Sequence, residues 1–157
     1  MSSQKLLAAH IIKRSAASTF DQARLEWRLD YIIIGDTNCP CSQAIKEVCF
    51  IINPVTKHTT YVGNVCINKF FGIDTGNMFA SLAKLTKDYH HNPNRDLINH
   101  AFLKWYITEQ EREFLLDTEH QRNFSIKQFA WKERIGYRIT HRKRIAEYQN
   151  RTQENQP

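Results

Sequence analysis

The sequence predicts an α+β protein, in which a small zinc-stabilised β-hairpin or three-stranded module is followed by a helical C-terminal half. Three observations predict this class. All four cysteines of the chain lie between residues 39 and 66. The segments around them are rich in β-branched and aromatic residues, which favour strands. From residue 77 onward, apolar side chains recur at three- and four-residue spacing, which is typical of helices with one buried face.

The order of these segments indicates four regions. We expect N-terminal helices in 1–30, a zinc-binding β module in 31–72, a helical region ending in a basic helix in 73–150, and a flexible tail in 151–157. A chain of 157 residues with 41% hydrophobic content can bury a core without a metal. Zinc would therefore fix one end of the protein without being its only source of stability.

Helical spacing of apolar residues predicts a first helix over 4–16 and a second over 20–29. Ser18-Thr19 provides a suitable N-cap for the second helix, and Trp27 is expected in its core face. The compact apolar run over 31–34 ends at a glycine and predicts a strand. Since an isolated hairpin is marginally stable in water, this strand is expected to join the hairpin that follows.

Alternation of side chains over 45–52 predicts a strand, and Asn53-Pro54 predicts a turn after it. The run over 59–62 is interpreted as the returning strand. Gly63-Asn64 predicts a second turn, because both residues tolerate positive φ. Cys66 then opens a short apolar segment that we expect to be helical. The expected order is a cysteine knuckle, a hairpin, a turn with a ligand and a short helix. This is the order of elements in a treble-clef or ribbon-like zinc module.

Four thiols gathered in this way can saturate one tetrahedral Zn²⁺ ion, and the predicted ligands are Cys39, Cys41, Cys49 and Cys66. Cys49 has an alternative interpretation, because free cysteine is often a small buried hydrophobe in a strand. His58 is then the nearest nitrogen donor. Two disulfides or four unpaired thiols are the competing interpretations of the set, and disulfides need an oxidising compartment.

The N-terminus predicts a cytoplasmic chain with reduced thiols and no membrane partner. Its apolar run is short, is interrupted by His10, and is followed by Lys13-Arg14 where a signal peptide would place its cations first. The run is also far too short to span a bilayer.

The sequence resembles a known kind of small zinc module in the runs C-P-C at 39–41, F-I-I-N-P at 50–54 and V-G-N-V-C at 62–66. Such modules occur in uncharacterised proteins of bacteria, phages and mobile elements. In their pattern the second cysteine is often followed by glycine, where this chain has Ser42. The resemblance implies a metal site and a prokaryotic or phage source, and it implies no activity.

In the C-terminal half, helical periodicity predicts helices over 77–90 and 95–106. Two capping-box patterns, Thr108-x-x-Glu111 and Ser125-x-x-Gln128, predict the starts of two more. The last helix is expected to carry apolar residues as far as Tyr148.

The basic character of the chain, a net charge of +6, concentrates in this last helix. Arg134, Arg138 and Arg142 are four residues apart and would share one helical stripe. The candidate binding residues are Lys132, Arg134, Arg138, Arg142, Lys143 and Arg144. Such a stripe can contact the phosphates of DNA or RNA, or an acidic surface of a larger protein complex. A solvated helix end whose cations complement the helix dipole is the third interpretation.

The sequence favours a protein without enzymatic activity and without a small-molecule substrate. It contains no Gly-rich phosphate loop, no G-x-S-x-G and no H-E-x-x-H motif. A zinc ion with four thiolate ligands has no open position for a reactant. The acidic residues around Glu111 are interpreted as the solvated face of a helix.

Overall fold

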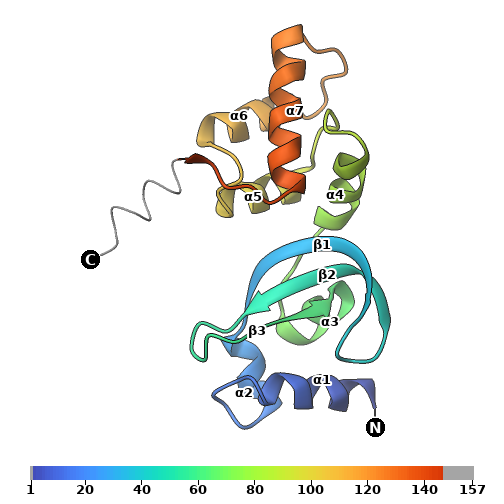
Figure 1. Ribbon diagram of the computed structural model, residues 1–157, viewed down its shortest axis with the longest axis vertical. Coiled ribbons are helices and arrows are strands. Elements are labelled where there is room, and N and C mark those ends of the chain that lie inside the picture. Colours follow the sequence, from blue (N-terminus) through green and yellow to red (C-terminus); the bar gives the residue numbers. More distant parts are fainter. Residues whose placement is uncertain (1, 147–157) are drawn as a thin grey trace, which may run out of the picture. The chain divides into compact units, whose positions relative to one another are not determined.

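The computed structural model of the chain describes residues 2–146 (Figure 1). It confirms the predicted α+β class, with a three-stranded antiparallel sheet followed by helices. The chain divides into two compact units, Met1–Thr75 and Gly76–Pro157. The sheet belongs to the first unit and the second is helical.

The N-terminal unit contains helices, the sheet and a short final helix. In chain order its elements are α1 (Ser3–Ile12), α2 (Phe20–Ala23), the 3₁₀ turn η1 (Arg24–Glu26), β1 (Arg28–Asn38), β2 (Ala44–Ile52), β3 (Thr59–Gly63) and α3 (Asn64–Phe71). The strands lie in the order β1-β2-β3, and each pairs antiparallel with its neighbour in sequence. The predicted third strand is thus present, and it joins the hairpin through β2.

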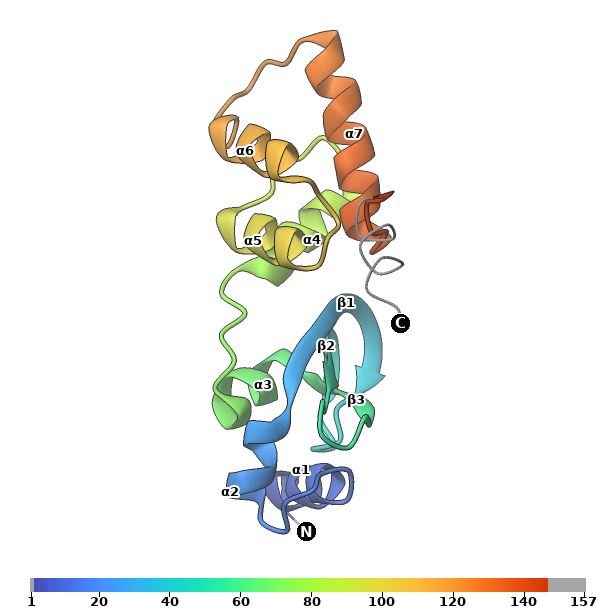
Figure 2. The same cartoon turned by 90° about the vertical axis from the view of Figure 1, so that its left-hand side faces the viewer.

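Strand β1 is longer than expected and bends along its length (Figure 2). Its register against β2 slips twice, between Leu29 and Tyr31 and between Ile34 and Thr37. Each slip places an extra β1 residue against β2, and such bulges bend a strand and increase its twist. The bend allows β1 to continue to Asn38, directly before the first cysteine.

The prediction of one helix over 20–29 is wrong. Helical structure ends at Glu26, Trp27 has an extended backbone, and Arg28 already pairs with Ile52 in the sheet. Trp27 is buried as expected, and its indole N–H donates to Ser15 Oγ at 2.9 Å. Pairing with β2 thus outweighs the helical periodicity of this stretch, because propensity is a weak guide where tertiary contacts compete.

One face of the sheet forms the core beneath α1. Cys49 pairs with Ile32 on one side and with Val62 on the other, and all three side chains are buried. The His10 Nε2 atom of α1 lies 2.7 Å from Thr60 Oγ1, so α1 covers this face. The opposite face carries a cross-strand ladder of aromatic rings, formed by Tyr31, Phe50 and Tyr61.

The C-terminal unit consists of α4 (Met78–Lys87), α5 (Arg95–Leu103), α6 (Glu109–Asp117) and α7 (Ile126–Thr140). Both predicted capping boxes are confirmed, at the starts of α6 and α7. Helix α4 contacts α5 and α7, and α5 contacts α6.

The last helix ends earlier than predicted. Helix α7 stops at Thr140, and Arg142 has the left-handed φ of 52°. The chain then turns so that the Ile145 N–H donates to the Trp105 carbonyl at 2.8 Å, and the Ile145 side chain is buried. The segment that ends at Ile145 therefore packs against the residues that follow α5, and it does not continue α7. The predicted apolar position at Tyr148 and the predicted tail over 151–157 lie outside the described residues.

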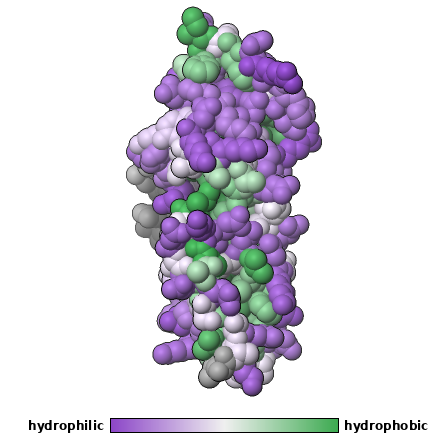
Figure 3. All heavy atoms as spheres, turned by 90° about the vertical axis from the view of Figure 1, so that its right-hand side faces the viewer, coloured by the Kyte–Doolittle hydropathy of each residue, from purple (hydrophilic) through white to green (hydrophobic). Residues whose placement is uncertain are grey.

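Hydrophilic residues predominate on the face of the molecule in Figure 3, and hydrophobic residues gather there in separate small patches. Within residues 2–146, no helix combines the length and the hydropathy needed to cross a membrane.

Candidate metal centre

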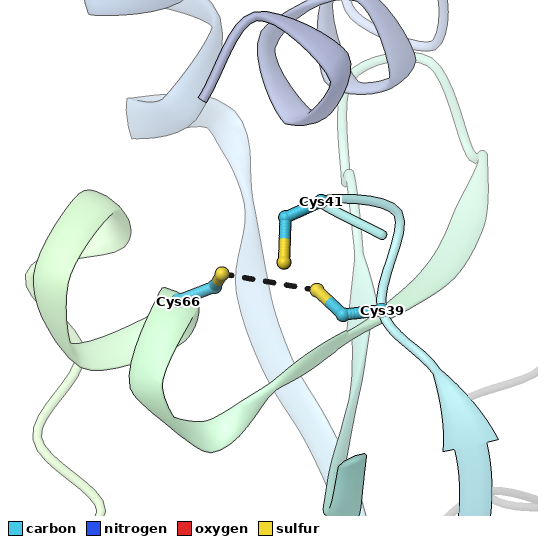
Figure 4. A group of neighbouring side chains, drawn as sticks. All are labelled: Cys39, Cys41 and Cys66. Carbon is cyan, nitrogen blue, oxygen red and sulfur yellow. Dashed lines mark hydrogen bonds between the residues drawn. The ribbon is translucent and has the colours of Figure 1, made fainter. Parts of the chain in front are cut away.

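Three of the four cysteines meet in the N-terminal unit (Figure 4). Cys39 directly follows β1, Cys41 lies in the turn before β2, and Cys66 lies in the first turn of α3. Their sulfur atoms all lie within 4.8 Å of one another, and the Cys39 and Cys66 Sγ atoms are 3.8 Å apart. The three residues are 3%, 4% and 7% exposed, so the cluster is closed off from bulk solvent.

The turn that carries the first two cysteines is held by backbone hydrogen bonds. Ser42 N–H donates to the Cys39 carbonyl at 2.8 Å, and Cys39 N–H donates to the Gln43 carbonyl at 2.8 Å. Ser42 has a φ of 83°, in the left-handed region that glycine adopts without strain. Ser42 therefore adopts this conformation at a cost in backbone strain.

Gly63 places the third cysteine. It is the N-cap of α3, and its N–H donates to Cys39 Sγ at 3.3 Å. A Cβ atom at this position would lie 2.9 Å from the Ile45 side chain, so the packing of β3 against Ile45 of β2 suits glycine. Cys39 and Cys41 also receive hydrogen bonds from backbone N–H groups in their own turn. Such N–H donors stabilise thiolate sulfur.

The three thiols of the cluster differ in the direction in which their pKa values are shifted. Burial raises the pKa of Cys39 and that of Cys66. Burial acts in the same direction on Cys41, but hydrogen bonds from the Gln43 N–H and from the two neighbouring thiols bring its pKa below the usual value. A metal ion supplies the positive charge that lets neighbouring buried thiols ionise together.

Cys49 does not join the cluster. It lies in the middle of β2 with none of its surface exposed, and burial together with the charge of Glu47 raises its pKa to about 12. Cys49 therefore fits the alternative interpretation given for it above, a small buried hydrophobic residue in a strand. His58 precedes β3 at the end of the sheet away from Cys66. The five residues of β3 span about 16 Å, so His58 is out of reach as well.

Of the predicted binding cations, Lys132 is buried in the C-terminal unit and Arg138 is partly buried there. Lys132 is 1% exposed, with its Nζ against Asn92 Oδ1 and 4.1 Å from the centre of the Phe124 ring. Burial lowers its pKa to about 8. Arg138 forms an ion pair with Glu111 and donates to the Tyr106 carbonyl at 2.9 Å. Arg138 thus joins α7 to α6, and Lys132 contacts residues of the loops before α5 and α7. The Lys132 side chain is almost inaccessible to a partner.

The other four predicted binding residues, Arg134, Arg142, Lys143 and Arg144, are exposed. They do not form the predicted stripe, because α7 ends at Thr140 and only Arg134 among them is helical. Lys143 lies over the Tyr137 ring, with its Nζ 5.0 Å from the ring centre. Arg142, Lys143 and Arg144 thus form a short exposed segment, which we call the basic segment.

The acidic helix face also needs correction at Glu111. This residue is 6% exposed and accepts hydrogen bonds from Trp131, Arg138 and the Thr108 backbone. The capping-box pattern predicted that the Glu111 side chain would reach back to the Thr108 N–H at the start of α6. Nothing in the spacing indicated that Arg138 would meet it there.

Comparisons with protein families, with curated proteins and with solved structures found no match for this chain. The fold and the cysteine cluster therefore define the class by themselves. The chain is an α+β protein with a buried group of three thiols that can hold a metal ion.

Proposed function

We propose that the chain is a zinc-binding protein, with Zn²⁺ held by the thiolates of Cys39, Cys41 and Cys66. The observation that carries this proposal is the convergence of three buried sulfurs within 4.8 Å from separate parts of the fold. Zinc takes thiolate ligands in tetrahedral sites, and backbone N–H···S bonds of the kind found here support such ligands. A water molecule, or a donor outside the cluster, would take the fourth position.

The zinc has a structural role in this proposal, and the protein has no enzymatic activity. The three ligand residues are almost completely buried, so a substrate has no ready path to the ion. The ion would tie the β1–β2 turn to the start of α3, two segments that are distant in the sequence. A cross-link of this kind stabilises the folded state because the unfolded chain holds no preformed site.

The second part of the proposal concerns the basic segment. Arg142, Lys143 and Arg144 are consecutive and exposed, and the Ile145 backbone hydrogen bond holds the end of this segment against the Trp105 carbonyl. We propose that the segment contacts an anionic macromolecule, either nucleic acid or an acidic protein surface. Opposite charge accelerates such an encounter and makes its affinity sensitive to salt.

Metal analysis of the purified chain tests the zinc site. We expect stoichiometric zinc by mass spectrometry in the wild type and in Cys49→Ala. We expect it to be lost in Cys39→Ala and in Cys66→Ala. Cobalt substitution provides a second readout, because thiolate ligands give an intense charge-transfer band. A folded Cys39→Ala variant that retains full zinc, or a wild type that binds no metal, would contradict the proposal.

A further inference from the structure

A groove of about 400 Å³ lies where α5 ends and α6 begins. Its apolar lining includes Phe102, Leu103, Trp105 and Ile145, and the carboxylate-bearing Glu109 also lines it. A hollow of this size matches the sites that take a small ligand or an anchoring side chain. The groove belongs wholly to the C-terminal unit and is separate from the cysteine cluster.

Backbone contacts fix the walls of the groove. Trp105 has a left-handed φ of 64°, which turns the chain between α5 and α6. The Tyr106 N–H donates to the Ala101 carbonyl at 2.9 Å, and the Ile145 N–H donates to the Trp105 carbonyl at 2.8 Å. Leu103 is 74% exposed, so it offers apolar surface at the rim. The hydrogen bonds hold the backbone of the walls, and a held backbone reduces the entropy lost on binding.

Several basic residues are next to lining residues of the groove in the sequence or in a ring contact. The three cations of the basic segment directly precede Ile145 in the chain, and Lys104 lies between two lining residues. Arg112 lies 5.1 Å from the centre of the Phe102 ring. Glu109 is the one acidic residue among the described residues that line the groove. An apolar hollow beside clustered cations is complementary to a ligand with an apolar anchor and acidic neighbours.

We propose that this groove binds a peptide segment of a partner protein, in which a large apolar side chain is flanked by Asp and Glu residues. The inference rests on the anionic partner proposed above and names its class. A nucleic acid would use the cations, but single-stranded binding sites stack bases on aromatic faces along an open charged channel. Here the hollow is concave and partly aliphatic, through Leu103 and Ile145. Burial of one large anchor strengthens binding by about tenfold to a hundredfold.

The test uses the zinc-loaded full chain and a random peptide library displayed on phage. We expect the enriched peptides to share an apolar residue between acidic ones. Synthetic, fluorescently labelled versions should lose affinity about tenfold or more against Leu103→Ser, which removes an exposed side chain and leaves the core intact. They should also lose affinity against a triple variant in which Arg142, Lys143 and Arg144 become Gln.

Ile126→Ser and Lys127→Gln are the matched controls. Ile126 is 91% exposed and Lys127 is exposed, and both lie at the start of α7. The 15 residues of α7 place that end about 20 Å from the end near the groove. Both controls should bind the peptides as the wild type does. Equal losses in the controls and in Leu103→Ser would overturn the assignment to the groove.

Single-stranded and duplex oligonucleotides form a second arm of the experiment. The peptide inference fails if no acidic, apolar motif is enriched while oligonucleotide binding depends on the basic segment and is unaffected by Leu103→Ser. In that outcome the proposed anionic partner survives as nucleic acid. If the triple variant changes neither peptide nor oligonucleotide binding, the partner proposal fails together with the inference. The zinc measurement is independent of both outcomes.

Discussion

Arg138 donates hydrogen bonds to both carboxylate oxygens of Glu111, and so joins α7 to the first turn of α6. The same carboxylate accepts from the Trp131 indole N–H at 3.0 Å. Glu111 is 6% exposed and the Arg138 side chain is 22% exposed. The pair is therefore a partly buried ion pair within the C-terminal unit, and Arg138, which was expected to bind a partner, is engaged in the fold.

Removing Arg138 should destabilise the protein strongly. Arg138→Met leaves the Glu111 carboxylate buried without its cation, which typically costs about 3–5 kcal/mol of unfolding free energy. Arg134→Met removes an exposed cation from the same helix and should change stability by no more than about 0.5 kcal/mol. Chemical denaturation at neutral pH measures both. Similar values for the two variants would show that the ion pair contributes little.

Acid should weaken the same contact. Burial by itself raises the pKa of Glu111, but the hydrogen bonds from Arg138 and from the Thr108 backbone outweigh it and lower the pKa below the usual value. A lowered folded-state pKa gives stability that is present above the unfolded value of 4.5 and is lost as pH falls through the folded value. We expect a smaller loss of stability below pH 4.5 in Glu111→Gln than in the wild type.

Lys132 should make the stability of the folded protein depend on pH in the alkaline range. Burial lowers its pKa from 10.5 to about 8, so between these values the unfolded chain binds more protons than the folded protein. The cost of burying the charged form is complete below pH 8 and disappears as pH rises toward 10.5. Across this window the wild type should gain stability relative to Lys132→Met. A stability difference that does not vary with pH would place Lys132 in a less buried setting.

Gly136→Ala should reverse the usual effect of this substitution in a helix. Alanine normally stabilises a helix interior by about 1 kcal/mol over glycine. At Gly136, however, a Cβ atom would lie 2.5 Å from the Tyr89 carbonyl oxygen and 3.0 Å from Tyr89 Cα. We expect a destabilisation of about 1–3 kcal/mol in thermal unfolding. Gly35→Ala, with no atom within 4 Å of its Cβ, is the control and should be nearly neutral.

Two positions with a left-handed backbone, Ser42 and Gly72, allow substitutions with opposite expected effects on stability. Ser42→Gly should relieve the left-handed backbone at φ 83° and stabilise the zinc-loaded protein by about 0.5–1 kcal/mol. Gly72 ends α3 at φ 65°, and Gly72→Ser should destabilise by about 1 kcal/mol for the opposite reason. Melting temperatures of the two variants should therefore move in opposite directions from that of the wild type.

Much of the fold could be predicted because it depends on local chemistry. The capping boxes at Thr108 and Ser125 located the starts of α6 and α7, since a cap involves residues only three positions apart. Alternation over 45–52 located β2 for a similar reason. The helix expected over 20–29 failed because Arg28 pairs with Ile52, and no local signal reports a partner so far along the chain.

The sequence by itself determined the fold class, the order of the elements and the gathering of the cysteines around one hairpin. It left open which thiols meet, and the tertiary structure selected Cys39, Cys41 and Cys66 because β2 carries Cys49 into the core. The tertiary structure also decided which cations face solvent. Burial and charge pairing depend on residues that only the folded chain brings together. Lys132 is therefore buried and Arg138 is paired with Glu111, while the basic segment stays exposed.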